Sequence, residues 1–334
     1  MSRKFPIVSV LGLDIGGANL KAAHVDGAAR SLPFALWRHP EGLREALDRL
    51  LAEMPPFDML AVTMTGELCD CFETKRQGVG YILDTVARLS AGKAVRVWQN
   101  EGRFTDVATA RANPFRTASA NWLALATFAG RFAPAGPALL LDIGSTTTDI
   151  IPLRDGQPIP TGRTDLERLA SGELLYTGAR RTPVCALLGT AGAAEWFATT
   201  LDVYLLLEDI AEDAADQDTA DGRPATRCHA HDRLARMLCA DRESLDCAAV
   251  RQLAERIAAQ QLNDIAKACQ RVAERGSAPP ETLIFSGSGE FLAHRLLALG
   301  ALARPKQVIS WRERLGVEIS SAACAYAVAV LACA

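Results

Sequence analysis

The chain has 334 residues, 49% of them hydrophobic, and a formal net charge of −3. This length is enough for two domains of ordinary size, each with its own core. A balanced charge argues against a nucleic-acid-binding protein, and neither a basic amphipathic stretch nor a membrane-spanning apolar stretch is present.

The N-terminal sequence and the cysteines bear on where the protein works. The apolar run at residues 7–13 reaches Asp14 too soon for the core of a signal peptide, so we expect a cytoplasmic protein. Nine cysteines are scattered along the chain, and an odd number cannot all be paired. Cys228, His229 and His231 could form half of a metal site, but no matching half is visible, so we expect reduced cysteines and no structural zinc.

The sequence LGLDIGGANLK, at residues 11–21, is the first motif with chemical content. An apolar run, a glycine turn and a second apolar run predict a strand, a tight turn and a strand. Gly16, Gly17 and Asn19 would form a turn whose backbone N–H groups approach an anion. Asp14 could hold a hydrated metal ion and Lys21 could neutralise phosphate charge. A plain hairpin is the alternative.

Periodicity predicts alternating strands and helices in the rest of the first half of the chain. We expect strands at residues 32–37, 59–63 and 94–98, and helices at 41–54 and 77–89. The polar sequence TMTGELCDCFETK, at residues 63–75, directly follows a buried strand, where open α/β sheets bind ligands. Its candidate site residues are Thr63, Thr65, Glu67, Asp70 and Lys75, and Glu101 lies in a charged turn after the next strand. An ordinary solvated loop is the alternative.

A predicted helix at residues 118–132 joins the two halves, and LLLDIGSTTTDIIPL then repeats the first motif at residues 139–153. Asp142 aligns with Asp14 and Gly144 with Gly16, and the hydroxyl-rich turn consists of Ser145, Thr146 and Thr147. A third glycine turn, FSGSGE, contains Gly287, Ser288 and Gly289. Two aspartate hairpins and a late G-x-G turn predict two related domains around one anion-binding site.

Arg180 and Arg181 precede a predicted break at Thr182–Pro183. They could clamp a phosphate or a carboxylate, or simply be solvated. Residues 208–221 carry seven carboxylates and predict a mobile loop or lid. Beyond them we expect helices at 229–240, 250–275 and 291–299, a strand at 307–309, and an apolar helix at 321–333 that packs between the domains.

In this order the motifs resemble those of the superfamily of sugar kinases, actin and heat-shock chaperones. The resemblance implies an α/β fold of two ribonuclease-H-like domains around a central phosphate-binding cleft. Residues 1–117 and 318–334 would form the first domain, and residues 118–317 the second, with a helical insertion.

Three longer motifs resemble one branch of that superfamily more closely: DIGSTTTDIIP, TD-x-x-RL-x-x-GELLYTG-x-RRTPV and TMTGEL-x-D-x-F-x-T-K. This is the hydantoinase/oxoprolinase-like branch associated with tetrahydromethanopterin-linked C1 transfer. The resemblance implies a transferase of methanofuran or methylofuran biosynthesis. It would join an aminomethylfuran-methyl diphosphate to the phenol of a γ-glutamyl-tyramine or tyrosine compound and release diphosphate.

Roles for the candidate residues follow from this resemblance. Mg²⁺ would be the cofactor, held by Asp14 and Asp142, with the diphosphate on the glycine turns and Lys21 beside it. Glu67 or Asp70, with Glu101 as a third candidate, would be the base. Arg180 and Arg181 would hold the glutamyl carboxylates, and Thr63, Thr65, Lys75 and Glu101 would contact substrate. The expected partners are small molecules, not nucleic acid or membrane, and a homodimer is possible.

Two other functions use the same turns. One is an ATP-dependent kinase or an ATP-hydrolysing amidohydrolase of the hydantoinase/oxoprolinase type, and the other is a non-catalytic nucleotide-binding regulator. ATP turnover would favour the first, whereas tight diphosphate binding without ATP turnover favours the transferase. A regulator has no need for the dense polar loop at residues 63–75.

Overall fold

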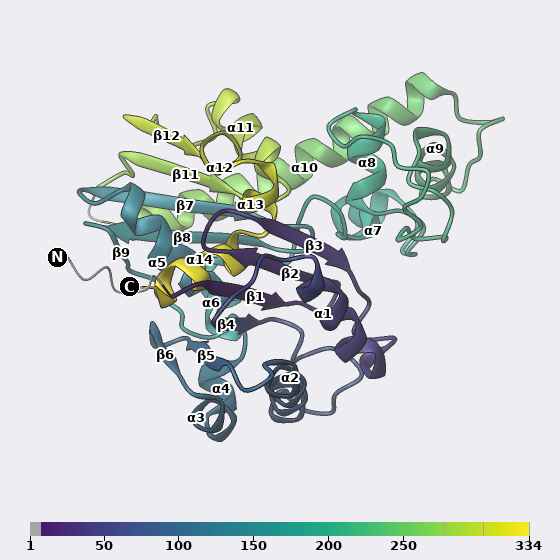
Figure 1. Cartoon of the computed structure of the whole chain (residues 1–334). Coiled ribbons are helices and arrows are strands. Elements are labelled where there is room, and N and C mark those ends of the chain that lie inside the picture. Colours follow the sequence, from purple (N-terminus) through teal and green to yellow (C-terminus); the bar gives the residue numbers. More distant parts are fainter. Residues whose placement is uncertain (1–7, 277, 303, 334) are drawn as a thin grey trace.

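The structure, a computed structural model, describes residues 8–276, 278–302 and 304–333 and contains two six-stranded sheets (Figure 1). The first sheet has the order β3 (Ala29–Pro33), β2 (Asn19–His24), β1 (Val10–Ile15), β4 (Met59–Met64), β5 (Ala94–Gln99) and β6 (Arg103–Thr105). The second has the order β10 (Leu174–Leu175), β8 (Thr148–Arg154), β7 (Pro137–Ile143), β11 (Thr282–Ser286) and β12 (Gln307–Ser310), and β9 (Gln157–Pro158) pairs with β8.

The two sheets repeat one topology. In each, an antiparallel hairpin comes first, β1–β2 or β7–β8. Its first strand then pairs in parallel with a later strand, β4 or β11, which pairs in parallel with β5 or β12. The predicted fold of two ribonuclease-H-like domains is confirmed. Both aspartate motifs therefore end the central strand of a sheet.

Two apolar helices lie between the sheets: α5 (Asn121–Ala129) and α14 (Ala323–Ala332). Their core joins Ala61 and Trp98 of the first sheet to Leu140 and Ile284 of the second. Gly12 allows α14 to approach β1, because a Cβ atom there would lie 1.9 Å from the carbonyl oxygen of Ala325. This is the position between domains that the small-residue composition predicts.

The remaining helices are distributed over both halves of the chain. The first half contains η1 (Pro40–Gly42), α1 (Leu43–Ala52), α2 (Lys75–Leu89), α3 (Val107–Ala112) and α4 (Pro114–Thr117), and η2 (Gly130–Phe132) follows α5. The second half contains α6 (Asp165–Ser171), α7 (Val184–Leu188), η3 (Gly189–Ala191), α8 (Thr200–Leu206), α9 (Arg227–Arg236), α10 (Cys247–Glu274), α11 (Glu290–Ala298), α12 (Trp311–Leu315) and α13 (Val317–Ser321). The long α10 runs from the second sheet to a group of helices formed by α7, α8 and α9 (Figure 1). No helix within the described ranges is both long enough and apolar enough to cross a membrane.

Two local predictions differ from the structure, and a third falls partly outside the described residues. The third strand is Ala29–Pro33 and not residues 32–37, because Phe34 and Leu36 donate their N–H groups to the first glycine turn, at Ala18 and Gly17. Helix α6 was not expected in the irregular sequence around residue 164, yet Thr164 and Glu167 form a capping box that begins it. Residue 7 of the first apolar run lies outside the described residues, and β1 begins at Val10.

Candidate phosphate and metal site

Both glycine turns close in the same way at the ends of β1 and β7. The N–H of Gly16 donates to the carbonyl of Asn19 (3.0 Å), and the N–H of Gly144 donates to that of Thr147 (2.9 Å). A loop from the neighbouring parallel strand lies against each turn. Thr65 donates its N–H to Ile15 (3.0 Å), and Gly289 donates its N–H to Ile143 (2.8 Å). The polar loop at residues 63–75 and the FSGSGE turn are thus parts of the two turn sites.

Close backbone approach explains the glycines of these loops. Gly287 has φ +92°, and a Cβ atom there would lie 2.3 Å from the Ile143 carbonyl oxygen and 2.8 Å from Oδ1 of Asp142. A Cβ atom on Gly16 would lie 2.9 Å from the carbonyl oxygen of Asn19. Ser288, between the two glycines, is exposed.

The turns present backbone donors that the protein itself does not use. Among the hydrogen bonds of the described residues, none has the backbone N–H of Ser145, Thr146, Thr147, Gly17 or Ala18 as its donor. All five residues are partly exposed. Successive free N–H groups at a turn form a concave donor set for an anion.

The two motif aspartates share one electrostatic environment. Burial raises the pKa of Asp14, and raises that of Asp142 to about 6, with the charges of Asp149 and Asp14 acting in the same direction on Asp142. The hydroxyl of Ser286 donates to Oδ1 of Asp142. Oδ1 of Asp14 and the hydroxyl of its register partner Thr63 are buried without a hydrogen-bond partner. Buried polar atoms without partners are costly and mark a place where a ligand or ion is expected.

These aspartates fit a magnesium ion. Mg²⁺ is usually bound through one or two carboxylates together with substrate phosphates and water. Over the ranges that the structure describes, no group of three or more His, Cys, Asp or Glu side chains could hold a metal by itself. The unpartnered Oδ1 of Asp14 and the nearby carboxylate of Asp142 match this carboxylate pattern of magnesium ligands.

Equivalent positions on the two hairpins carry opposite charges. Lys21 is the register partner of Asp14, and Asp149 is the register partner of Asp142. Lys21 forms no ion pair with any described residue, while its charge lowers the pKa of both Asp14 and Asp142. It is therefore available for an anion at the turns.

The buried Asp149 is neutralised by Arg168, which the sequence alone did not single out. Arg168 is 1% exposed, donates to Asp149, and lies with its guanidinium carbon 4.1 Å from the centroid of the Trp122 ring. Burial raises the pKa of Asp149 and the charge of Arg168 lowers it. Both residues stand in the long motifs, Asp149 in DIGSTTTDIIP and Arg168 in the RL dipeptide, which is the signal that could have identified them.

Glu67 is the buried carboxyl of the polar loop at residues 63–75. Its side chain is fully buried, Oε1 accepts a hydrogen bond from the Ser119 hydroxyl (2.7 Å), and Oε2 has no partner. Burial raises the pKa of Glu67 to about 7, whereas Ser119 and Lys75 lower it and Asp165 raises it. A carboxyl group with a pKa near neutrality can accept a proton at physiological pH.

The other two base candidates lie in different surroundings. Asp70 is exposed. Glu101 is bound by two arginines, with Oε2 2.5 Å from Arg103 and Oε1 2.8 Å from Arg116. Of the three carboxylates, Glu67 alone combines burial with a free oxygen.

Arg180 and Arg181 lie at the second glycine turn, where both backbone N–H groups donate to Ser145. Their side chains bind the acidic segment at residues 208–221: Arg180 is 2.6 Å from Asp216, and Arg181 is 3.3 Å from Asp218. Arg181 also lies 4.7 Å from the ring centroid of Trp37, which belongs to the first half of the chain. The acidic segment is irregular, as expected of a loop, and its mobility stays a prediction.

Three large apolar or aromatic side chains in the segments next to Glu67 are exposed. Tyr176 is 71% exposed, Leu68 is 64% exposed and Leu166 is 79% exposed. Burial raises the pKa of Tyr176, and the charges of Asp165, Cys69 and Glu67 raise it further, which places the tyrosine near Glu67 although it directly follows β10 of the second sheet. An aromatic substrate would find apolar contacts here.

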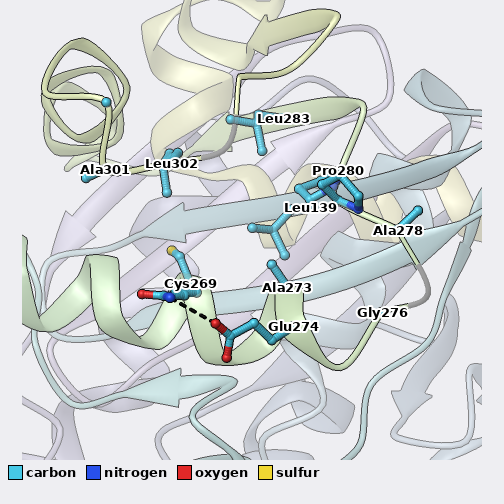
Figure 2. A pocket seen from close by; sticks show the side chains of 13 residues that line it. Leu139, Cys269, Ala273, Glu274, Gly276, Ala278, Pro280, Leu283, Ala301 and Leu302 are labelled. Atoms are coloured by element: carbon cyan, nitrogen blue, oxygen red, sulfur yellow. Dashed lines mark hydrogen bonds between the residues drawn. The ribbon is translucent and has the colours of Figure 1, made fainter.

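A separate cavity of about 540 Å³ lies at the opposite ends of β7 and β11 (Figure 2). Leu139, Leu283 and Leu302 are among its apolar lining residues, and Gln270 donates to Glu274 beside it (2.9 Å). It contains none of the turn residues, so it is not part of the phosphate site.

Known proteins resemble this chain over most of its length. The hydantoinase/oxoprolinase family model matches residues 58–330. The (4-{4-[2-(gamma-L-glutamylamino)ethyl]phenoxymethyl}furan-2-yl)methanamine synthase of Methanocaldococcus jannaschii is 32% identical over 335 residues, covering 97% of each chain. The protein of the same name from Methanococcus vannielii is 32% identical over 201 residues, covering 58% of this chain and 89% of its own length.

A solved structure shares the fold. It is the nucleotide-free acetone carboxylase, from a study of ATP-dependent acetone carboxylation, with a TM-score of 0.51 and 11% identity. The match covers 96% of this chain and 70% of that one. At this identity the likeness supports the architecture and carries nothing about substrate.

Proposed function

The chain belongs to the hydantoinase/oxoprolinase family, and we propose that it is the transferase that forms the aryl ether of a methanofuran-type cofactor. Its curated relatives are synthases, which supports an enzyme with a biosynthetic role. The product in their name contains a phenoxymethyl group joined to a furan. The substrates proposed here are an aminomethylfuran-methyl diphosphate and a γ-glutamyl compound of tyramine or tyrosine.

The proposed reaction is a displacement at the furfuryl carbon. The phenol oxygen donates an electron pair to that carbon, and the bond from the carbon to the diphosphate oxygen breaks. The phenol proton passes to Oε2 of Glu67, and the bond electrons leave with diphosphate. A phenol has a pKa of about 10, so a base with a pKa near neutrality lowers the cost of using its oxygen as a nucleophile.

The two turns suit the leaving group. Their free N–H groups would bind the diphosphate oxygens, and Lys21 would add a positive charge. Asp14 and Asp142 would hold Mg²⁺, which supplies charge neutralisation for the departing diphosphate. The expected cofactor therefore matches the unpartnered oxygen on Asp14.

The phenolic substrate would bind beside Glu67. Its ring would contact Tyr176 and the exposed leucines, and its glutamyl carboxylates would replace Asp216 and Asp218 on Arg180 and Arg181. In this arrangement the acidic segment occupies the arginines until substrate arrives.

The observation that carries the proposal is Glu67, a buried carboxyl with one free oxygen and a pKa of about 7. The test is to incubate the pure protein with both substrates and Mg²⁺ and to follow ether and diphosphate by mass spectrometry. Equal yields of ether and diphosphate, both strongly reduced in E67Q, support the proposal. A phosphorylated or hydrolysed product made with ATP, and no ether, would show that the protein is an ATP-dependent kinase or amidohydrolase.

A further inference from the structure

Ser119 occupies an unusual place in the chain. It lies in the three-residue connection between α4 (Pro114–Thr117) and α5 (Asn121–Ala129), where the chain first passes from one sheet to the layer between both. Its φ is +47°, in the left-handed region that serine adopts only at a cost. Strain of this kind persists where the surroundings fix it, and it concentrates at functional sites.

Both flanks of this connection are anchored. On the first side, the hydroxyl of Thr117 accepts a hydrogen bond from Gln99 of β5 (3.1 Å), and Asn100 donates its N–H to Arg116 (2.8 Å). On the second side, Trp122 and Leu123 of α5 are buried in the core between the sheets. Ser119 is therefore held between two fixed elements, and its backbone conformation sets where the hydroxyl points.

That hydroxyl donates to Oε1 of Glu67, across 52 residues of sequence, at 2.7 Å. With one oxygen bound, only Oε2 remains without a partner. We propose that Ser119 is a positioning residue, whose hydroxyl fixes the Glu67 carboxylate so that Oε2 receives the proton. This inference rests on the proposed role of Glu67 as the base.

Four other side chains interact electrostatically with the same carboxyl. Lys75, at the first turn of α2, lowers the pKa of Glu67, and Asp165, at the start of α6, raises it. Cys69, in the same loop, and Tyr176, after β10, lie close enough for Glu67 to raise their pKa values. None of these four side chains donates a hydrogen bond to Glu67 in the described structure. The backbone N–H of Glu67 also lowers the pKa of its own carboxyl, and among the described side chains Ser119 is the donor that binds Oε1 and leaves Oε2 free.

The hydrogen bond also favours the ionised form of Glu67. Without it, the base holds its proton to higher pH. We expect S119A to move the acidic limb of the kcat/KM profile upward by about one to two pH units, the effect of a hydrogen bond to an ionised group. S119G removes the hydroxyl but relieves the backbone strain, and it should show the same shift.

The test compares S119A, S119G, S119T and E67Q in the ether-forming assay across pH. S119T keeps the hydroxyl, so the acidic limb of its kcat/KM profile should stay at the wild-type pH. This holds even if the β-branched side chain lowers the yield of folded protein. S90A is the matched control, because the Ser90 hydroxyl is also part-buried but donates only to a backbone carbonyl (2.9 Å). The S90A profile should match wild type.

The outcomes separate the two proposals. An E67Q variant with wild-type ether formation would refute the base, and with it the proposed role of Ser119. An inactive E67Q combined with unshifted limbs in S119A and S119G would overturn the Ser119 proposal alone. If wild type forms no ether, infrared difference spectra of wild type against E67Q still measure the pKa of Glu67. The same spectra of S119A must then show a higher value for the inference to stand.

Discussion

Replacing Arg168 with methionine tests whether Arg168 stabilises the buried carboxylate of Asp149 in the second hairpin. Arg168 is 1% exposed and its partner Asp149 is 8% exposed, so removing the guanidinium leaves a buried charge unpaired. Breaking a buried pair on one side costs about 3–5 kcal/mol. Loss of the cation–π contact with Trp122 adds about 0.5–2 kcal/mol. We expect R168M to lose about 3.5–7 kcal/mol of unfolding free energy in total.

The loss should depend on pH with a definite sign. In the folded protein, burial raises the pKa of Asp149 and Arg168 lowers it, so R168M raises this pKa further. A carboxyl whose folded pKa exceeds its unfolded value destabilises the fold as pH rises through the interval between them. R168M should therefore be closer to wild type at pH 5 than at pH 8.

Urea denaturation followed by tryptophan fluorescence measures both effects. D149N/R168M removes both charges and should recover most of the loss. R111M is the control, because Arg111 and Asp84 form an exposed pair whose loss costs about 0–1 kcal/mol. The reasoning is refuted if R168M loses less than about 1 kcal/mol, or if the double variant is no more stable than R168M.

Four further predictions concern the reaction. D14N and D142N should weaken Mg²⁺-dependent diphosphate binding, measured by calorimetry, and unchanged magnesium dependence would argue against the metal site. E67Q should lower kcat by about 10²–10⁴-fold. The wild-type kcat/KM should fall about tenfold per pH unit below pH 7, because Glu67 must be ionised to act; a flat profile there would exclude it as the base. R180A and R181A should raise KM for the γ-glutamyl substrate with little change in kcat, and in hydrogen exchange residues 208–221 should lose protection when that substrate binds.

The sequence predicted features whose signals are local. Each aspartate hairpin combines an apolar run, a glycine turn and a second run within 15 residues or fewer, and both fold as expected. The amphipathic α1, α2 and α10 were predicted from their periodicity. The site role of residues 63–75 was inferred because the loop follows a buried strand, and it does lie against the first turn.

The features that escaped prediction depend on partners far apart in the chain. Ser119 meets Glu67 across 52 residues, and Arg180 meets Asp216 across 36. A single sequence contains no signal for such pairings, and nothing in it indicates that Ser119 has a left-handed backbone. Arg168 does stand in a long motif, but its burial and its pairing with Asp149, 19 residues away, appear only in the structure.

The two hairpins differ in charge at one equivalent position, Lys21 and Asp149, and that difference explains how the site balances its charge. Asp14 faces Lys21 across the first hairpin, whereas Asp142 faces Asp149 across the second. Arg168 neutralises the negative charge of Asp149, and Lys21 neutralises that of one of the two motif aspartates. One negative charge therefore remains among these five groups. A bound dication would turn it into a net positive charge, so the site should bind diphosphate together with Mg²⁺ far better than diphosphate alone.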